Sequence, residues 1–519
     1  MLDSTPRPAS GIEPRPWQTG LAPAYIGLFL WVGFLDQVGR RALPVGGLAC
    51  SVLGALVAGP ACYLLMFRAA GLWGFRSGRL LAGVAASTFG ERGALVLPGL
   101  LLAAAQVLVF GLAVGYAIDL TLDGLVVGRL LDPRAVRPTP FRGAQIPTRL
   151  VLLTALVWAM ATALVSLRFV RWIGALMQFF PIFPAFLLGL VMLATLGGLR
   201  TFRPSGIDPL DGSVVPLLQS CWRAFALTFQ WVFAFTAMSC VLGADWGPGS
   251  AGERDVRLGG WVGVGFAPAI VAALTLLAVA GFEGSSARPG PPSPRAGPRP
   301  GPREAARPAA PPSGSTIGDL PAPGTLDLGP TAGPSAPFTF RAVLKGAFDP
   351  RLACGMLMVF GLASLAPAVF SAYSAWSGLA TLAPGISKVA WSVIVGTTGW
   401  LLIVAGWQDR PATAFDLLGA GFAPMAGALA ADFALSRGRW RGPRRGINPT
   451  GVLAWASGAA VGLAPTVAQA LGSKRLNHFE PAALAAFAVA FLAYALFALL
   501  RLQSGRAGAV ASDPSEMQA

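Results

Sequence analysis

Long apolar windows without a charged residue recur along the whole chain and constrain its fold more than any other feature. A helix crosses the hydrocarbon layer of a bilayer with about 20 apolar residues, because each residue adds about 1.5 Å. Two further stretches, 16–35 and 413–435, are long enough for a span although Asp36, Asp416 and Asp432 lie at or near their ends. The sequence therefore predicts about twelve spans. The charge-free windows are 42–67, 93–118, 150–167, 172–199, 224–244, 258–282, 352–387, 389–408, 446–473 and 481–500, of which 352–387 has room for one span plus a re-entrant piece.

These windows favour helices over strands. A membrane β-barrel would show segments of about ten residues with strict alternation of apolar and polar side chains, whereas these runs are continuous and longer. Inside lipid each backbone amide must be bonded within its own segment, which a helix achieves. Small residues in strings such as 54–61 and 457–464 allow the helices to approach closely. The predicted fold class is an all-α polytopic membrane protein of about twelve transmembrane helices.

The overall composition supports lipid as the solvent and argues against a nucleic-acid partner. The chain is 54% hydrophobic and 12% charged, too apolar for an exterior that faces water. Its formal net charge of +16 is scattered over short connections rather than gathered on one aromatic-rich face, so we expect no nucleic-acid partner. A lipid bilayer and a small-molecule substrate are the expected partners, with the protein acting as a monomer.

Few residues could support enzyme or metal chemistry. The chain has a single histidine, His478, and five cysteines that lie in or beside apolar runs without metal-ligand spacing. We interpret the cysteines as small core residues. The sequence predicts no enzyme activity, no bound metal and no cofactor other than a coupling ion, Na⁺ or H⁺.

A proline-rich stretch divides the spans into seven and five. Residues 283–347 are rich in Pro and Gly and carry several arginines, a composition that predicts a disordered linker. The predicted organisation is a tail (1–19), helices 1–7 (20–282), this linker, helices 8–12 (348–502) and a second tail (503–519). Arginines are modestly enriched in the loops around 68–92 and 437–445, which predicts cytoplasmic termini in a multi-pass plasma-membrane protein.

Several strings resemble the nucleobase–cation symporter family, which contains the cytosine and purine permeases. The first is 88-TFGERGALVLPGLLLAAAQVLVFG-111, which is similar to that family's passage into the third helix. The most specific is 423-APMAGALAADFALSRGRW-440, followed by 446-GINPTGVLAWASGAAVGL-463, which resembles the connection of the tenth and eleventh helices. Shorter similarities are 244-ADW-246 and 371-SAYSAWSGLATLAPGISK-388. The resemblance covers residues 20 to 502.

The resemblance implies a LeuT-type fold, in which two inverted five-helix repeats surround a central site and two accessory helices follow. Broken first and sixth helices would then expose backbone groups to the substrate and ion. Gly33 and Gly39 flank the string 33-GFLDQVGRR-41, where we expect the first break, and Gly243 and Gly247 weaken the end of the sixth helix.

The usual recognition residues of that family are largely replaced. Val109 stands where the family stacks an aromatic ring on the nucleobase, and Thr236, beside Phe235, stands at the aromatic position of the sixth helix. The polar positions of the eighth helix, which hold Na⁺ and the base edge in the family, read Ala366, Pro367 and Ala368. Gly33 and Ser364 are the remaining candidates for ion binding.

The other candidate site residues are polar or aromatic side chains within the spans. Ionisable groups at such positions are costly and often functional. Asp36 and Gln37 near the expected break form the first pair, although Asp36 could instead pair with Arg40 four residues on. Gln106 lies midway along the third span, where a buried amide needs partners. Phe370 and Tyr373 are candidate lining residues on the eighth helix.

Three functions remain open at this stage. The preferred hypothesis is a secondary transporter of a small, nucleobase-like organic solute that works by alternating access. The second is a transporter-derived sensor or scaffold that binds without transport, or a transporter of an unrelated solute. The third, a membrane-embedded enzyme, lacks any visible cluster of acids, histidines or a nucleophile.

Overall fold

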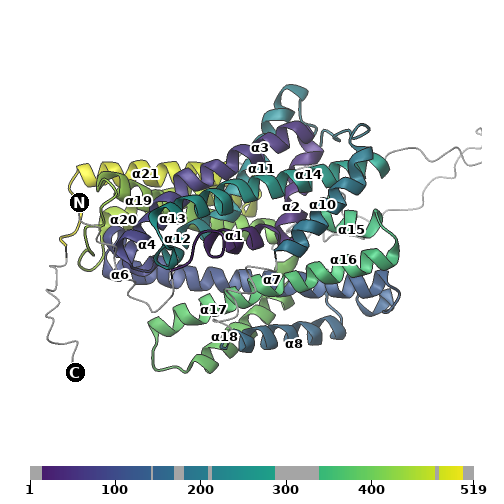
Figure 1. Ribbon diagram of the computed structural model, residues 1–519, viewed down its shortest axis with the longest axis horizontal. Coiled ribbons are helices and arrows are strands. Elements are labelled where there is room, and N and C mark those ends of the chain that lie inside the picture. The colour runs from purple at the N-terminus through teal and green to yellow at the C-terminus, as the bar shows by residue number, and fades with distance from the viewer. Residues whose placement is uncertain are drawn as a thin grey trace, which may run out of the picture.

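The computed structural model describes residues 14–141, 144–168, 181–207, 213–286, 338–473 and 479–506. Most of the predicted linker and the outer parts of both tails, together with His478, lie outside these residues. The last part of the predicted linker forms a short helix, α15 (Phe340–Gly346), directly before the eighth span. Nearly every other described element is also a helix (Figure 1).

The bounds of the elements follow the predicted windows closely. The α-helices before residue 287 are α1 (Leu21–Phe29), α2 (Val32–Gly46), α3 (Leu48–Ala61), α4 (Arg68–Ser77), α5 (Leu81–Phe89), α6 (Glu91–Ala94), α7 (Leu102–Val127), α8 (Arg149–Val165), α10 (Ile182–Thr195), α11 (Leu217–Val241), α12 (Gly243–Trp246), α13 (Glu253–Gly260) and α14 (Ala267–Ser286). After α15 come α16 (Pro350–Ala363), α17 (Leu365–Leu382), α18 (Lys388–Val404), α19 (Pro411–Leu435), α20 (Pro449–Ala470) and α21 (Ala482–Leu499).

Short elements of other kinds connect these helices. Three π-helical turns, η1 (Cys62–Phe67), η2 (Leu95–Leu101) and η6 (Trp261–Phe266), join α-helices into longer spans. One antiparallel hairpin, β1 (Thr139–Phe141) with β2 (Ala144–Ile146), is an addition to the predicted all-α fold. The remaining 3₁₀ turns are η3 (Pro133–Ala135), η4 (Leu196–Gly198), η5 (Gly247–Gly249) and η7 (Trp407–Asp409).

The described helices account for the predicted number of spans. Eight are long and apolar enough to cross a membrane, the bent pair α1 and α2 makes a ninth, and α8, α10 with η4, and α18 are shorter apolar helices. The eighth span is a single interrupted helix, Pro350–Leu382, rather than a span with a re-entrant piece. Large apolar side chains such as Leu153, Phe183 and Leu193 are more than 60% exposed, as expected for surfaces that face lipid.

The first span is broken two residues before the predicted position. α1 ends at Phe29 and α2 begins at Val32, with a bend of 53° between them. The string 33–41 is helical, so the expectation of a break there was wrong. The break occurs where Trp31 adopts an extended backbone conformation (ψ 132°). A Cβ atom at Gly33 would lie 2.7 Å from the Trp31 ring, so glycine at this position leaves room for the indole.

The helices pack in two groups that meet around the first span. We call α2, α3, α11 and α14 the α11 group, because α11 and α14 both pack on α2 and α3. We call α7, α8, α16, α17 and α18 the α7 group, because α7 packs on each of the other four. Figure 1 shows the α7 group along the lower side and the α11 group along the upper side. The last two helices, α20 and α21, pack on α19 and are the least buried of the long spans.

Small residues bring neighbouring helices close together, as the sequence predicts. A Cβ atom at Gly54 of α3 would lie 2.5 Å from the carbonyl oxygen of Phe225 on α11. A Cβ atom at Gly59 would lie 2.1 Å from the carbonyl oxygen of Gly265. Because no other residue would fit without moving a backbone, these glycines set the distance between α3 and its two neighbours.

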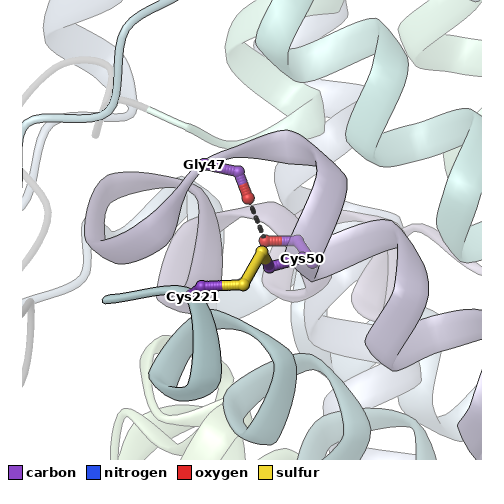
Figure 2. Close-up of a disulfide and its surroundings, with 4 residues drawn as sticks. Gly47, Cys50 and Cys221 are labelled. Carbon is purple, nitrogen blue, oxygen red and sulfur yellow. Dashed lines mark hydrogen bonds between the residues drawn. A yellow bond between two sulfur atoms is a disulfide. The ribbon is translucent and has the colours of Figure 1, made fainter. Parts of the chain in front are cut away.

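A disulfide joins two of the cysteines that the sequence suggested were core residues. Cys50, in the first turn of α3, is bonded to Cys221, near the start of α11 (Figure 2). The expectation was therefore wrong for this pair, because the contact depends on two segments 171 residues apart in sequence. It holds for Cys62 and Cys240, which are free and buried.

The disulfide marks one end of the spans, which we call the disulfide end. The opposite end, which we call the arginine end, carries the loop after α4 and the connection between α19 and α20. There Arg76 pairs with Glu253 at 2.9 Å and donates to the carbonyl oxygen of Gly438 at 3.0 Å. α4 and α6 lie at the left of Figure 1, and α15 lies at the right.

Candidate binding cavity

A cavity lies beside the break of the first span, where α1, α7, α11, α12, α16 and α17 meet the start of α10. The centre of a water molecule can occupy about 70 Å³ of this cavity. No Asp, Glu, Lys or Arg occurs among the described residues that line it. The lining residues are Ala24, Tyr25, Gly27, Leu28, Leu30, Trp31, Gln106, Val109, Pro181, Pro184, Met238, Ser239, Leu242, Trp246, Ala363, Ala366, Pro367, Phe370 and Ser371.

Gln106 is the most unusual residue of this wall. Its side chain is 1% exposed, and neither the oxygen nor the nitrogen of its amide has a hydrogen-bond partner among the described residues. A buried polar group left unpaired costs about 1–3 kcal/mol. Such a group in a cavity wall is suited to bind a molecule that enters the cavity.

Aromatic rings form much of the remaining wall. Trp246 and Phe370 face each other across the boundary between α12 and α17, with ring centroids 6.0 Å apart and planes inclined by 27°. Trp31 contributes a third ring at the break of the first span. The hydroxyl of Tyr25 donates a 2.6 Å hydrogen bond to the carbonyl oxygen of Ser239 and so joins α1 to α11 at the cavity. The cavity can therefore offer ring faces to a flat solute.

The structure brings three of the predicted site residues together at this cavity. Gln106, Val109 and Phe370 line it. Val109 offers an aliphatic surface, as the sequence indicated, and aromatic rings come instead from Trp31 and Trp246. Sequence reasoning missed these two residues, although Trp31 directly precedes the expected break and Trp246 belongs to the string 244–246.

Asp36 and Gln37 lie outside the residues that line the cavity. The carboxyl of Asp36 accepts a 2.7 Å hydrogen bond from the backbone N–H of Arg341 on α15. The expected local alternative, a pair with Arg40, is replaced by this contact with a residue far along the chain. The amide nitrogen of Gln37 donates to the hydroxyl of Tyr116 at 3.4 Å.

Three further candidates have structural contacts within the protein. The Thr236 hydroxyl donates to the carbonyl oxygen of Val232 in its own helix at 2.5 Å. Phe235 packs on Phe415 with ring centroids 4.5 Å apart. Tyr373 makes an edge contact with Trp376. None of the three lines the cavity.

The candidates for ion binding lie at the breaks of the first and eighth spans. Gly33 is buried beside Trp31, and the buried Ser364 separates α16 from α17. The Ser364 hydroxyl donates to the carbonyl oxygen of Phe360 in its own helix at 3.2 Å. The eighth-span residues that face the cavity near the break are Ala363, Ala366 and Pro367, whose side chains carry no oxygen.

The strings that carry the family resemblance meet at the arginine end. Asp432 accepts hydrogen bonds from the hydroxyls of Ser87 at 3.0 Å and Thr88 at 2.9 Å. Asn448 donates to the carbonyl oxygen of Thr88, and Arg444 donates to that of Ser87. These contacts hold the residues just before the third span against α19 and the start of α20, which are distant in sequence.

Comparisons with known proteins show which solved structures share this fold. The chain matches no protein-family profile, and no curated protein matches its sequence. It is similar in structure to Mhp1, a nucleobase-cation-symport-1 family transporter solved in a closed conformation with bromovinylhydantoin bound, at a TM-score of 0.55 and 16% identity over 96% of each chain. The inward-facing conformation of Mhp1 matches at a TM-score of 0.53 and 15% identity, over 95% of this chain and 92% of that one.

A second kind of transporter gives a similar match. A Na⁺-coupled sialic acid symporter, solved in a substrate-bound outward-open state, has a TM-score of 0.51 and 11% identity over 95% of this chain and 91% of that one. These likenesses extend over nearly the whole membrane part. The chain therefore has the LeuT-type fold of these symporters, with two inverted five-helix repeats followed by two further helices.

Proposed function

We propose that this protein is a secondary transporter that moves a small uncharged organic solute across the membrane by alternating access. The observation that carries the proposal is the buried, unpaired amide of Gln106 in the wall of a cavity beside the broken first span. A solute that binds there would satisfy both atoms of the amide. In the LeuT-type fold, helix breaks and a central site of this kind serve transport.

The lining favours a neutral, flat, nucleobase-like solute. A glutamine amide offers one acceptor and one donor group, which complements a ring that carries N–H and C=O side by side. A charged solute would enter a wall without ionised side chains and lose its hydration without compensation. The rings of Trp31, Trp246 and Phe370 supply flat apolar surfaces. Mhp1 was solved with bromovinylhydantoin bound, which supports the same class of solute.

A coupling ion, Na⁺ or H⁺, is part of the proposal. Ala366 and Pro367 supply no side-chain oxygen at the cavity, so Na⁺ near the two breaks would depend on backbone carbonyls and on the hydroxyl of Ser364. Uptake into proteoliposomes under a Na⁺ gradient alone, and under a H⁺ gradient alone, distinguishes the two ions. Uptake that needs neither gradient would remove coupling from the proposal.

We further propose that both termini are cytoplasmic and that the protein lies in the plasma membrane. Disulfides persist on the oxidising side of a membrane, so the Cys50–Cys221 pair favours an extracytoplasmic disulfide end. The arginine loops then face the cytoplasm, in agreement with the bias of positive charge toward that side. The linker between α14 and α15 would be extracytoplasmic in this arrangement.

The central test is solute binding to the purified protein in detergent, followed by uptake into proteoliposomes. We expect uracil, hydantoin or related neutral rings to bind, and Gln106→Leu to weaken binding by at least tenfold. Gln219→Leu is the matched control, because Gln219 is exposed. Failure of all neutral rings to bind would overturn the proposal. Binding without uptake would instead favour a transporter-derived sensor.

A further inference from the structure

The short helix α15 is fixed at the disulfide end by both apolar and charged contacts. The hydroxyl of Thr339 caps it by accepting from the backbone N–H of Ala342 at 3.2 Å. Phe340 is fully buried and meets the edge of Phe360 with ring centroids 5.4 Å apart. Arg341 and Lys345 are spaced by four residues and therefore project from the same side of the helix. In Figure 1, α15 lies beside α16 and near α2.

The guanidinium group of Arg341 lies among three carboxylates. Its nitrogens are 3.5 Å from Asp36, 3.6 Å from Asp119 and 3.7 Å from Asp123. Lys345 supports the same cluster with a 2.6 Å ion pair to Asp123. Burial disfavours the charged form of Arg341, but the carboxylates outweigh it and raise the pKa of the guanidinium above its usual value, so Arg341 remains a cation.

These carboxylates belong to different helix groups. Asp36 lies on α2 of the α11 group, whereas Asp119 and Asp123 lie on α7 of the α7 group. Arg341 therefore bridges the two helix groups, and alternating access proceeds by the rocking of one packed group of helices against another. The disulfide between Cys50 and Cys221 joins two helices of one group and leaves this boundary free.

A continuous line of rings connects this bridge to the cavity. The guanidinium carbon of Arg341 lies 5.3 Å from the centre of the Tyr116 ring. That ring meets the indole of Trp31 with centroids 5.5 Å apart, and Trp31 lines the cavity. Phe415 also packs on Trp31, with ring centroids 5.9 Å apart. Packed aromatic rings thus fill the path from the cavity to α15, where Arg341 forms its ion pairs.

We propose that Arg341 locks the disulfide end of the transport pathway by forming ion pairs with Asp36 of the α11 group and with Asp119 and Asp123 of the α7 group. Opening toward that end requires the guanidinium to leave at least one helix group. This inference rests on the proposed transport function, because it assumes that the cavity opens alternately to the two ends. Its test, however, measures access to the cavity and not transport.

The experiment measures how fast a cysteine in the cavity reacts with a membrane-impermeant thiol reagent. Ser371→Cys supplies the reporter, in a background with Cys354→Ser, since the remaining thiols are buried or bonded. Right-side-out and inside-out vesicles allow the reagent to be added to each end separately. Arg341→Gln is compared with Arg351→Gln, an exposed arginine in the first turn of α16 near the same end.

We expect Arg341→Gln to raise the labelling rate from the disulfide end at least tenfold, and Arg351→Gln to leave it unchanged. Arg341→Lys should give an intermediate rate, because an ammonium keeps the charge but cannot contact all three carboxylates at once. Gel filtration and total labelling in detergent establish that each variant is folded.

An unchanged rate in folded Arg341→Gln would overturn the inference, as would an equal increase from both ends. Uptake and labelling separate the two proposals. If the unmodified protein takes up solute but Arg341→Gln does not change the labelling rate, only the lock is refuted. A change in labelling without any solute uptake removes the transport function and leaves the lock in place.

Discussion

The hydroxyl of Tyr25 and the backbone carbonyl of Ser239 are joined by a 2.6 Å hydrogen bond across 214 residues of sequence. Ser239 lies two residues before the end of α11, where carbonyl groups lose their partners within the helix. The bond therefore satisfies a helix end and fixes α1 against α11 at the cavity.

Replacement of Tyr25 by Phe tests the importance of this contact. The change removes the donor and leaves a buried carbonyl without its partner, so we expect a loss of about 1–3 kcal/mol in the free energy of unfolding. Thermal unfolding in detergent measures the loss. Tyr373→Phe serves as the control, because Tyr373 is only partly buried and outside the cavity. Equal stability of the two variants would contradict the prediction.

Val109→Trp tests whether the solute binds inside the cavity. An indole at this position would fill space next to Gln106, and we expect solute affinity to fall at least tenfold. Leu100→Trp adds the same ring to the same span on an exposed surface and should leave affinity unchanged. Tighter binding to Val109→Trp would mean that a ring on the third helix stacks on the solute.

Gly54→Ala should destabilise the contact between α3 and α11. The added methyl group would lie 2.5 Å from the carbonyl oxygen of Phe225, so one backbone must move. Overpacking of this kind costs about 1–3 kcal/mol. Gly189→Ala is a matched control in a helix, because nothing lies within 4 Å of its added methyl group. Thermal unfolding of both variants gives the comparison, and a loss in Gly189→Ala as large as in Gly54→Ala would refute the explanation.

Asp432→Ala should destabilise the arginine end. The carboxylate accepts from Ser87 and Thr88, and its removal leaves two buried hydroxyls without that acceptor. We expect a loss of about 1–3 kcal/mol for the pair of contacts, measured by chemical or thermal unfolding. Glu91→Ala, at an exposed position nearby, should be close to neutral.

Thiol counting tests the disulfide. The denatured, unreduced protein should present three reactive thiols, from Cys62, Cys240 and Cys354, and reduction should raise the number to the five cysteines of the sequence. Cys50→Ala with Cys221→Ala should unfold more easily by about 2–4 kcal/mol, since the bond closes a long loop. Five free thiols before reduction would contradict both the bond and the orientation inferred from it.

The sequence by itself determined the solvent, the class of element and the number of spans. Apolar windows long enough to cross a bilayer can satisfy their backbone only as helices, and this local rule does not depend on the order in which they pack. Gln106 could be identified in the same way, because an amide in the middle of an apolar run must find a partner. The glycines of the string 54–61 likewise indicated close helix contacts.

Only the tertiary structure decided which side chains meet. Asp36 stands beside the expected break in sequence, yet a residue 305 positions later supplies its partner. Cys50 and Cys221 are each unremarkable within their apolar windows, and Trp246 becomes part of a cavity only when its ring meets Phe370 of α17. Pairings of this kind arise because helices with similar apolar surfaces are placed by the packing of the whole bundle, which no local pattern encodes.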